Sequence, residues 1–331
     1  GITPGGHSGV KEALVSAGLM LIYFLVSNLV RSRTWLNITL ALCITSATIT
    51  SFIGIAEFLL GFAKLDWIDS SMFSGITGRV TSVFENPNVL SSYLILIIPV
   101  TIAVCIYHKE RNVRLLCAIC AAIMIWCVVL TWSRGAWLGL AAGIVLLLLS
   151  ASSKNLLFVP PAAGALLIAS WVFPDTFGAR LGNIFTVVDS SNHYRVSIWR
   201  GVGNMLRESW ACGIGAGELN FRAVYINFAS FGIEDAPHAH SLYLQLLVQV
   251  GVMGLVFLFA TLFLSAQKVY SHKFDSRADK ATGLIAVGCF CGVVAMLGFG
   301  LFDYTWYNYR ILFTFWAFLG LASAAVNVGR E

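Results

Sequence analysis

The sequence predicts an all-α integral membrane protein: a polytopic bundle of about nine transmembrane helices with one large helical loop outside the membrane. Of the 331 residues, 58% are hydrophobic and only 11% are charged, whereas soluble domains carry about 25% charged residues. Apolar runs of about 20 residues, which a helix needs to cross about 30 Å of hydrocarbon, recur along the chain. Most of these runs lack the polar stripe of a soluble helix.

The expected spans divide the chain into three parts. In chain order they are Ala13–Val30, Leu36–Gly61, Val89–Tyr107, Leu115–Thr131, Gly135–Leu149, Leu156–Phe173, Leu242–Ser265, Thr282–Leu301 and Ile311–Val326. Residues 1–173 form an N-terminal membrane part with six spans, 174–240 an external helical loop, and 241–331 a C-terminal membrane part with three spans.

The eight cysteines are expected to pack as apolar residues. All but Cys212 lie in expected spans, where Cys behaves as a small hydrophobe. Cys117 and Cys120 form a C-x-x-C, but no second pair or nearby His completes a zinc set. Cys212 has no partner in the external loop. The sequence therefore predicts no metal site.

The distribution of Lys and Arg predicts the orientation. Alternate connections between spans are basic, and the positive-inside rule places such connections in the cytoplasm. Their cations are Arg31, Arg33, Lys109, Arg111, Arg114, Lys154, Lys268, Lys273, Arg277 and Lys280. The other connections, including the long loop, are then external.

The external side is expected to carry arginine rather than lysine. Apart from Lys11 and Lys64, its cations are Arg79, Arg134, Arg180, Arg195, Arg200, Arg207, Arg222 and Arg310. A guanidinium group is planar, permanently charged and suited to paired hydrogen bonds with phosphate or carboxylate. The set indicates an anionic ligand at the outer face, although any single arginine could instead pair with an acidic residue or extend to lipid headgroups.

The external loop is expected to form a helical cap. Tyr194–Glu208 and Leu219–Phe231 each carry an apolar stripe at helical spacing. The Gly-rich segment Gly213–Gly217 follows no strand, so we interpret it as a tight turn before the second helix rather than a dinucleotide site.

Two histidines end this loop, directly before a span. His238 and His240 could act as general bases, because imidazole changes protonation near neutral pH. Two residues apart, they are expected to point in different directions in a helix or a strand. A shared metal would need partners that the sequence does not place, and interfacial placement at a helix start is the simpler alternative.

The motifs, taken in order, resemble the O-antigen ligase and polymerase family. They are Arg79–Asn88, Thr131–Leu138, Arg195–Gly201, Gly213–Gly217 with Asn220 and Phe221, His238–Gln245, and Gly251–Leu255. Ser241 departs from the family, which usually has Asn at that position. Family members have a GT-C-like bundle of about twelve spans, with the large loop before the last three. Because the chain begins with Gly1 rather than Met, we expect about three N-terminal spans to be missing, although an artificial boundary would give the same start.

The resemblance implies a ligase-type glycosyltransferase of the bacterial cytoplasmic (inner) membrane. Family members transfer a glycan from undecaprenyl diphosphate to an acceptor on the outer face, with neither a metal nor a nucleotide cofactor. The resemblance also implies that arginines bind the donor diphosphate. The leading candidates are Arg134 and Arg200, and the next are Arg195 and Arg79. His240, with His238 second, is expected to act on the acceptor.

The expected partners follow from the same resemblance. They are an undecaprenyl-diphosphate-linked glycan donor, a glycan or glycolipid acceptor such as lipid A-core, and membrane lipid, with no nucleic acid. A polymerase that joins repeat units is the first alternative. A transporter or flippase of lipid-linked sugars is the second, but transporters place their charged sites near the bilayer midplane. A peptidoglycan polymerase would carry different motifs.

Overall fold

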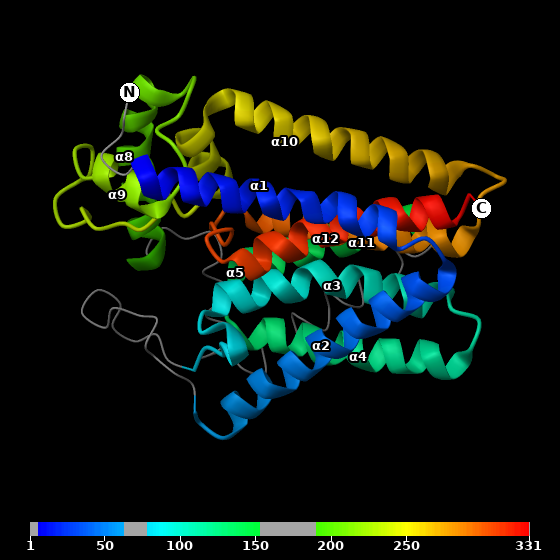
Figure 1. The fold of residues 1–331 in the computed structure, drawn as a ribbon. Coiled ribbons are helices and arrows are strands. Elements are labelled where there is room, and N and C mark those ends of the chain that lie inside the picture. The colour runs from blue at the N-terminus through cyan, green and yellow to red at the C-terminus, as the bar shows by residue number, and fades with distance from the viewer. Residues whose placement is uncertain (1–5, 63–77, 153–189, 331) are drawn as a thin grey trace.

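The long apolar helices of the computed structural model lie side by side in a bundle, with two further helices at one end (Figure 1). The structure describes residues 6–62, 78–152 and 190–330. Within these ranges the chain forms helices and turns, with no strand. The predicted all-α fold is therefore confirmed.

Eight of the described helices are long and apolar enough to cross a membrane. They are α1 (Gly6–Leu29), α2 (Arg33–Leu59), α3 (Pro87–Tyr107), α4 (Arg111–Leu130), α5 (Arg134–Ala151), α10 (Leu242–Phe274), α11 (Lys280–Phe299) and α12 (Tyr309–Val328). Each corresponds to a predicted span. The remaining predicted span, Leu156–Phe173, lies outside the described residues.

Helix α10 is longer than predicted. The prediction ended it at Ser265, but the helix continues to Phe274 and takes Lys268 out of the expected connection. The Lys268 ammonium group donates a hydrogen bond to the Ser323 hydroxyl of α12 at 2.5 Å. A lysine near a helix end can keep its charge at the interface while its stem packs on apolar surface, so it does not mark where the helix stops.

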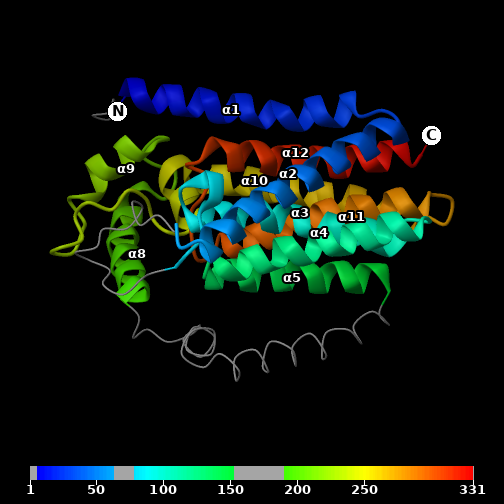
Figure 2. The same cartoon turned by 90° about the horizontal axis from the view of Figure 1, so that it is seen from below.

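Helix α11 lies in the centre of the bundle and packs against α3, α5 and α12 (Figure 2). Small residues allow this close packing. Gly135, Gly139 and Gly143 fall on one face of α5, four residues apart. A Cβ at Gly139 would overlap the Ala295 carbonyl oxygen of α11, and one at Gly143 would lie 2.7 Å from the Cys291 carbonyl oxygen. Such small-residue stripes let helix backbones approach closely within a bilayer.

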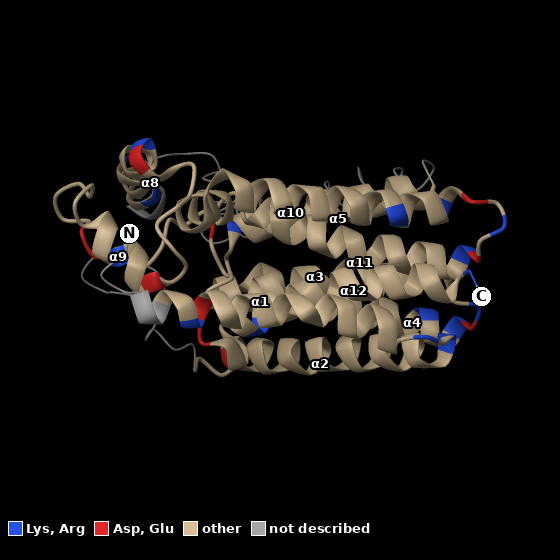
Figure 3. Cartoon of the chain, turned by 45° about the horizontal axis from the view of Figure 1, so that its top comes forward, with Lys and Arg blue, Asp and Glu red and all other residues tan. Residues whose placement is uncertain are grey.

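Charged side chains gather at the two ends of the bundle, and its middle is almost free of them (Figure 3). The basic connections α1–α2, α3–α4 and α10–α11 lie at the end that carries the C-terminus (Figure 1). The N-terminus and the two further helices lie at the other end (Figure 1). The predicted alternation of basic and non-basic connections thus agrees with the arrangement. Which end faces the cytoplasm stays a prediction.

The two further helices form a cap with its own small core. They are α8 (Ser190–Ser209) and α9 (Glu218–Tyr225). The core residues are Ile198, Val202, Met205, Phe221, Tyr225, Ala236, Ala239 and Val248. The first cap helix agrees with the prediction, but the second ends at Tyr225 rather than Phe231. Tight turns follow Tyr225, and Phe231 is fully exposed, so its place in the apolar stripe is coincidental.

The glycine turn joins the cap to the membrane part. Gly213, Gly215 and Gly217 all have positive φ, and Gly217 caps α9, so the turn seats the second cap helix as predicted. The Ile214 amide donates to the Val248 carbonyl oxygen at 2.8 Å, where α10 is kinked at Gly251. The cap is therefore fixed to the start of α10, where the two histidines lie.

Candidate functional site

His238 and His240 converge on one carboxylate, that of Asp303 in the α11–α12 connection. The two imidazole centroids are 4.2 Å apart, and Nδ1 of His240 lies 3.1 Å from Oδ1 of Asp303. The prediction that the rings point in different directions is wrong. His240 has a φ of 45°, a left-handed conformation that breaks the alternation of an extended chain.

Asp303 is 4% exposed and accepts several hydrogen bonds. Its Oδ1 also accepts from its neighbour, the Tyr304 amide, at 2.8 Å, and its Oδ2 accepts from the Asn88 side-chain amide. The Arg195 guanidinium lies 3.9 Å from Oδ2. Burial by itself would raise the pKa of Asp303, but the hydrogen bond with His240 and the nearby charges hold this pKa below its usual value.

An ionised Asp303 fixes the tautomer of His240. The carboxylate can only accept, so Nδ1 of His240 carries the proton and donates it to Asp303. The lone pair of Nε2 is then available to take a proton from another molecule. This is the arrangement of a general base held by a carboxylate.

His238 is a neutral neighbour that positions the pair. Burial, followed by the proximity of His240, lowers the pKa of His238 to about 3. Its ring stacks on Tyr307 at 5.3 Å, and its Nδ1 accepts a hydrogen bond from the His240 amide at 3.3 Å. Between the histidines, the Ala239 amide donates to Oε1 of Gln245 at 2.7 Å, which holds the loop in place.

Arg79 connects this centre to the α4–α5 turn. Its Nε donates to the Thr131 carbonyl oxygen at 2.7 Å, and its Nη2 donates to Oδ1 of Asn88 at 2.9 Å. Asn88 in turn donates to Asp303. One guanidinium group therefore joins the start of α3, the α4–α5 turn and the carboxylate that holds His240.

Arg134 begins α5 at the same end of the bundle. A Cβ at the next residue, Gly135, would lie only 2.9 Å from the Cβ of Phe302, the chain neighbour of Asp303. The helix start thus packs directly beside the connection that carries the carboxylate. Arg200 differs: it is exposed on α8, and within the described ranges no hydrogen bond or ion pair joins it to this cluster.

Left-handed backbone conformations occur at the capped end of the bundle. Among the described residues, the non-glycine positions with positive φ are Ser82, Glu85, Trp132 and His240. All four lie in connections that meet at the capped end of the bundle. Each costs about 1–3 kcal/mol, and such strain gathers at functional sites when the surrounding structure holds it in place.

The distances at this centre would also admit a metal ion. Ligand atoms of His238, His240 and Asp303 lie within 4.8 Å of one another. However, both oxygens of Asp303 already accept N–H groups, and the Arg195 guanidinium faces one of them. A cation would have to replace these donors and lie near a permanent positive charge. The donor set fits a hydrogen-bonded dyad better than a metal site.

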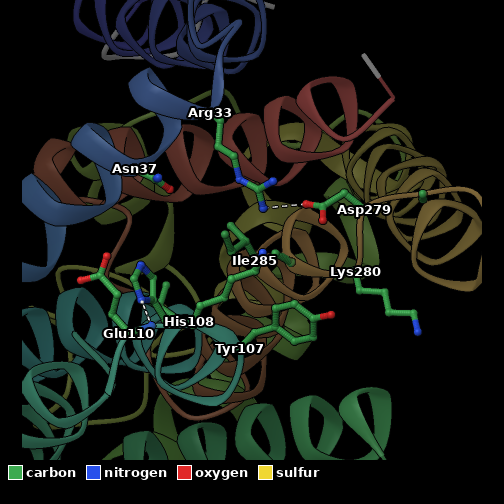
Figure 4. Close-up of a pocket in the computed structure, with 12 residues that line it drawn as sticks. Arg33, Asn37, Tyr107, His108, Glu110, Asp279, Lys280 and Ile285 are labelled. Atoms are coloured by element: carbon green, nitrogen blue, oxygen red, sulfur yellow. Dashed lines mark hydrogen bonds and ion pairs between the residues drawn. The ribbon is translucent and has the colours of Figure 1, made fainter. Parts of the chain in front are cut away.

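A large cavity lies elsewhere, at the end of the bundle with the basic connections (Figure 4). It has a volume of about 650 Å³ and includes Arg33, which pairs with Asp279 at 2.7 Å. Its charged groups belong to half-exposed or exposed residues of the connections, and within the described residues none forms a buried dyad. The cluster of His238, His240 and Asp303, in contrast, lies at the capped end.

Three functional residues were not predicted. Asp303 is the only acidic residue in the connection 302–310, and this was a signal in the sequence. Asn88 lay inside a family-like motif but was not singled out. Glu57 of α2 accepts from the Thr81 and Ser82 amides at 3.0 and 2.7 Å and so holds the segment after Arg79. Its role depends on a contact between distant segments.

Comparison with known proteins agrees with this geometry. Residues 119–259 match the family model described as O-antigen ligase, and this range contains Arg134, Arg195, Arg200 and both histidines. The chain is also 23% identical over 338 aligned positions to the teichuronic acid biosynthesis protein TuaE of Bacillus subtilis (strain 168). That alignment covers 96% of this chain, which spans 66% of the length of the relative. The chain is therefore similar to the O-antigen ligase family over the matched residues and to this relative over most of its length, and the bundle of apolar helices agrees with a multi-pass membrane protein.

Proposed function

We propose that the protein transfers a glycan from undecaprenyl diphosphate to an acceptor hydroxyl, without a metal ion, at the outer face of the bacterial cytoplasmic membrane. One observation carries this proposal: the His240–Asp303 dyad adjoins Arg195 and the Arg79–Asn88 link at the capped end of an apolar bundle. The dyad supplies a base, the arginines supply charge for a diphosphate, and the apolar helices accommodate a lipid tail.

The acceptor oxygen forms a bond to the anomeric carbon, while the bond from that carbon to the diphosphate oxygen breaks and leaves its electron pair on oxygen. The hydroxyl proton passes to Nε2 of His240, and Asp303 stabilises the resulting imidazolium. The imidazolium then returns its proton to solvent as undecaprenyl diphosphate departs.

Negative charge grows on the diphosphate during this step. Preorganised guanidinium groups stabilise such charge strongly where water is scarce. Arg134 and Arg195 are the proposed diphosphate residues, and Arg79 supports them by holding Asn88. Arg200 remains a candidate that would act from the exposed surface of α8.

The proposed reaction is a single transfer to a surface acceptor such as a glycolipid. A polymerase that joins repeat units of a surface polysaccharide is the second candidate; the name of the Bacillus relative places that protein in teichuronic acid biosynthesis. A transporter is disfavoured, because the ionisable groups of the described residues gather at the ends of the bundle rather than in its middle (Figure 3).

Purified protein in lipid nanodiscs should transfer glycan from undecaprenyl diphosphate when a glycolipid acceptor is added. His240→Ala should retain donor binding and lose transfer by about 10²-fold or more. Addition of one glycan per acceptor supports a ligase, and a ladder of products without acceptor supports the polymerase. Absence of transfer by wild-type protein in both conditions, with bound donor, contradicts the proposal.

A further inference from the structure

A second, polar cavity adjoins His238. Its volume is about 120 Å³, and it lies between α1, the start of α9, α10 and the α11–α12 connection. A buried water needs about 10–15 Å³, so several waters or the edge of a larger polar molecule fit. The residues that line the cavity include Glu12, Glu218, His238, Gln245, Tyr307 and Trp306.

Two residues that line this cavity carry buried N–H groups without partners. Gln245 is 1% exposed, and its Oε1 accepts from the Ala239 amide while its Nε2 has no partner among the described residues. Trp306 is 6% exposed, and its Nε1 is likewise unpartnered. Buried donors in this state are unfavourable, and an acceptor oxygen of a ligand would relieve both.

The charges in the lining limit the class of ligand. Glu12 and Glu218 contribute carboxylates, and no described lining residue is Lys or Arg. Carboxylates accept hydrogen bonds from hydroxyl groups, but they repel a diphosphate or an acidic sugar. Uncharged ligands with both hydroxyl donors and oxygen acceptors match the lining.

Aromatic rings supply the remaining surface. Tyr304, Trp306, Tyr307 and Tyr309 line the cavity, and Tyr307 also stacks on His238. Such rings present large apolar faces with a polar group at the edge. A pyranose ring has C–H faces and a hydroxyl rim, so it can use both.

We propose that this cavity binds an uncharged sugar residue of the acceptor glycan, recognised through its hydroxyl or acetamido groups. The assignment rests on the proposed function and names the acceptor class for that site. The cavity adjoins the histidine pair through His238, whose ring is 4.2 Å from that of His240, and none of the candidate diphosphate arginines lines it. The sugar is thereby held beside the base and apart from the donor diphosphate.

Two substitutions test the unpartnered donors. Trp306→Phe removes the indole N–H and keeps an aromatic ring, and Gln245→Glu keeps an acceptor for the Ala239 amide while it removes the Nε2 donors. Each should raise the KM for an acceptor oligosaccharide ending in N-acetylhexosamine about tenfold, and in Trp306→Phe, which leaves the Gln245–Ala239 hydrogen bond intact, kcat and the donor KM should be nearly unchanged. Trp316→Phe is the matched control, since Trp316 is also 6% exposed with an unpartnered Nε1 but lies outside this cavity.

Binding without donor separates this proposal from the reaction itself. The same oligosaccharide should bind purified wild-type protein and Trp316→Phe in saturation-transfer NMR, and Trp306→Phe should weaken the signal. That result supports the subsite even if transfer is not observed. Normal acceptor KM values for both Trp306→Phe and Gln245→Glu, in an enzyme that transfers glycan, overturn the subsite and leave the proposed function intact. Tighter binding of an oligosaccharide ending in a uronic acid also overturns it, as does a rise in the donor KM alone.

Discussion

Asp303 determines which chemistry His240 can perform. Its carboxylate is buried, accepts the Nδ1–H of His240 and is linked through Asn88 to Arg79. A base without this partner could rotate or adopt the other tautomer. In the proposed mechanism, proton acceptance by His240 and diphosphate binding near Arg79 are therefore coupled through one hydrogen-bonded network of side chains.

His238 should make the protein sensitive to acid. Burial lowers its pKa to about 3 from 6.5, so the unfolded chain binds more protons than the folded chain between these two values. The contribution of the neutral His238 to stability is fully present above about pH 6.5 and is lost as the pH falls toward 3. In His238→Asn, Tm should fall less than in wild type between about pH 7.5 and 4.5, measured by thermal unfolding in detergent. His193→Asn, which changes an exposed histidine of α8, should follow wild type. Parallel curves for wild type and His238→Asn would refute this role.

The sequence indicated residue types that suit the proposed site, but it did not show how their side chains meet. Arginines and histidines could be selected because an anionic donor and a proton acceptor require them. The convergence of the histidines could not be predicted, because it depends on the left-handed φ of His240. Asp303 could have been noticed as an isolated acid in an external connection, but its contacts come from the folded chain.

At the scale of helices, the glycine stripe of α5 determines where Arg134 lies. Gly135 packs beside Phe302, and Gly139 packs against the Ala295 carbonyl of α11. The start of α5 is thereby held next to the Asp303 connection. A larger residue on this face would separate the helices and move the guanidinium away from the dyad.

Gly139→Ala should therefore destabilise the protein by about 1–3 kcal/mol and reduce glycan transfer, because its Cβ would overlap backbone atoms of α11. Gly18→Ala in α1 is the matched control, since no atom lies within 4 Å of its Cβ. That control should be neutral or stabilising by up to about 1 kcal/mol. Thermal unfolding and transfer assays measure both effects. Equal behaviour of the two variants would show that close packing of α5 on α11 is unimportant.

Helices were predictable where the bilayer dictates them. A span must be apolar over the hydrocarbon thickness, so composition alone located all eight described spans. The predicted C-terminal ends of the second cap helix and of α10 were wrong, because the thickness of the membrane sets neither boundary. The end of α9 depends on local turns, and α10 continues past Lys268.

Across the whole molecule, the site forms where several distant segments meet at one end of the bundle. The start of α3, the α4–α5 turn, α8, the loop before α10 and the α11–α12 connection each contribute a residue. The alternation of basic connections predicted that these segments share an end. It could not predict which side chains touch, because these contacts join residues far apart in the sequence, such as Asn88 and Asp303, which are separated by 215 positions.

The central claim is that the His240–Asp303 dyad activates the acceptor. Single-turnover transfer by Asp303→Asn, with bound undecaprenyl-diphosphate glycan, tests it most directly. The rate should fall on the order of 10²–10⁴-fold while donor binding is retained, because the amide no longer fixes the Nδ1–H tautomer or stabilises the imidazolium. Asp275→Asn, at an exposed position in the α10–α11 connection, should transfer at the wild-type rate. A folded Asp303→Asn protein that also transfers at the wild-type rate would contradict the account.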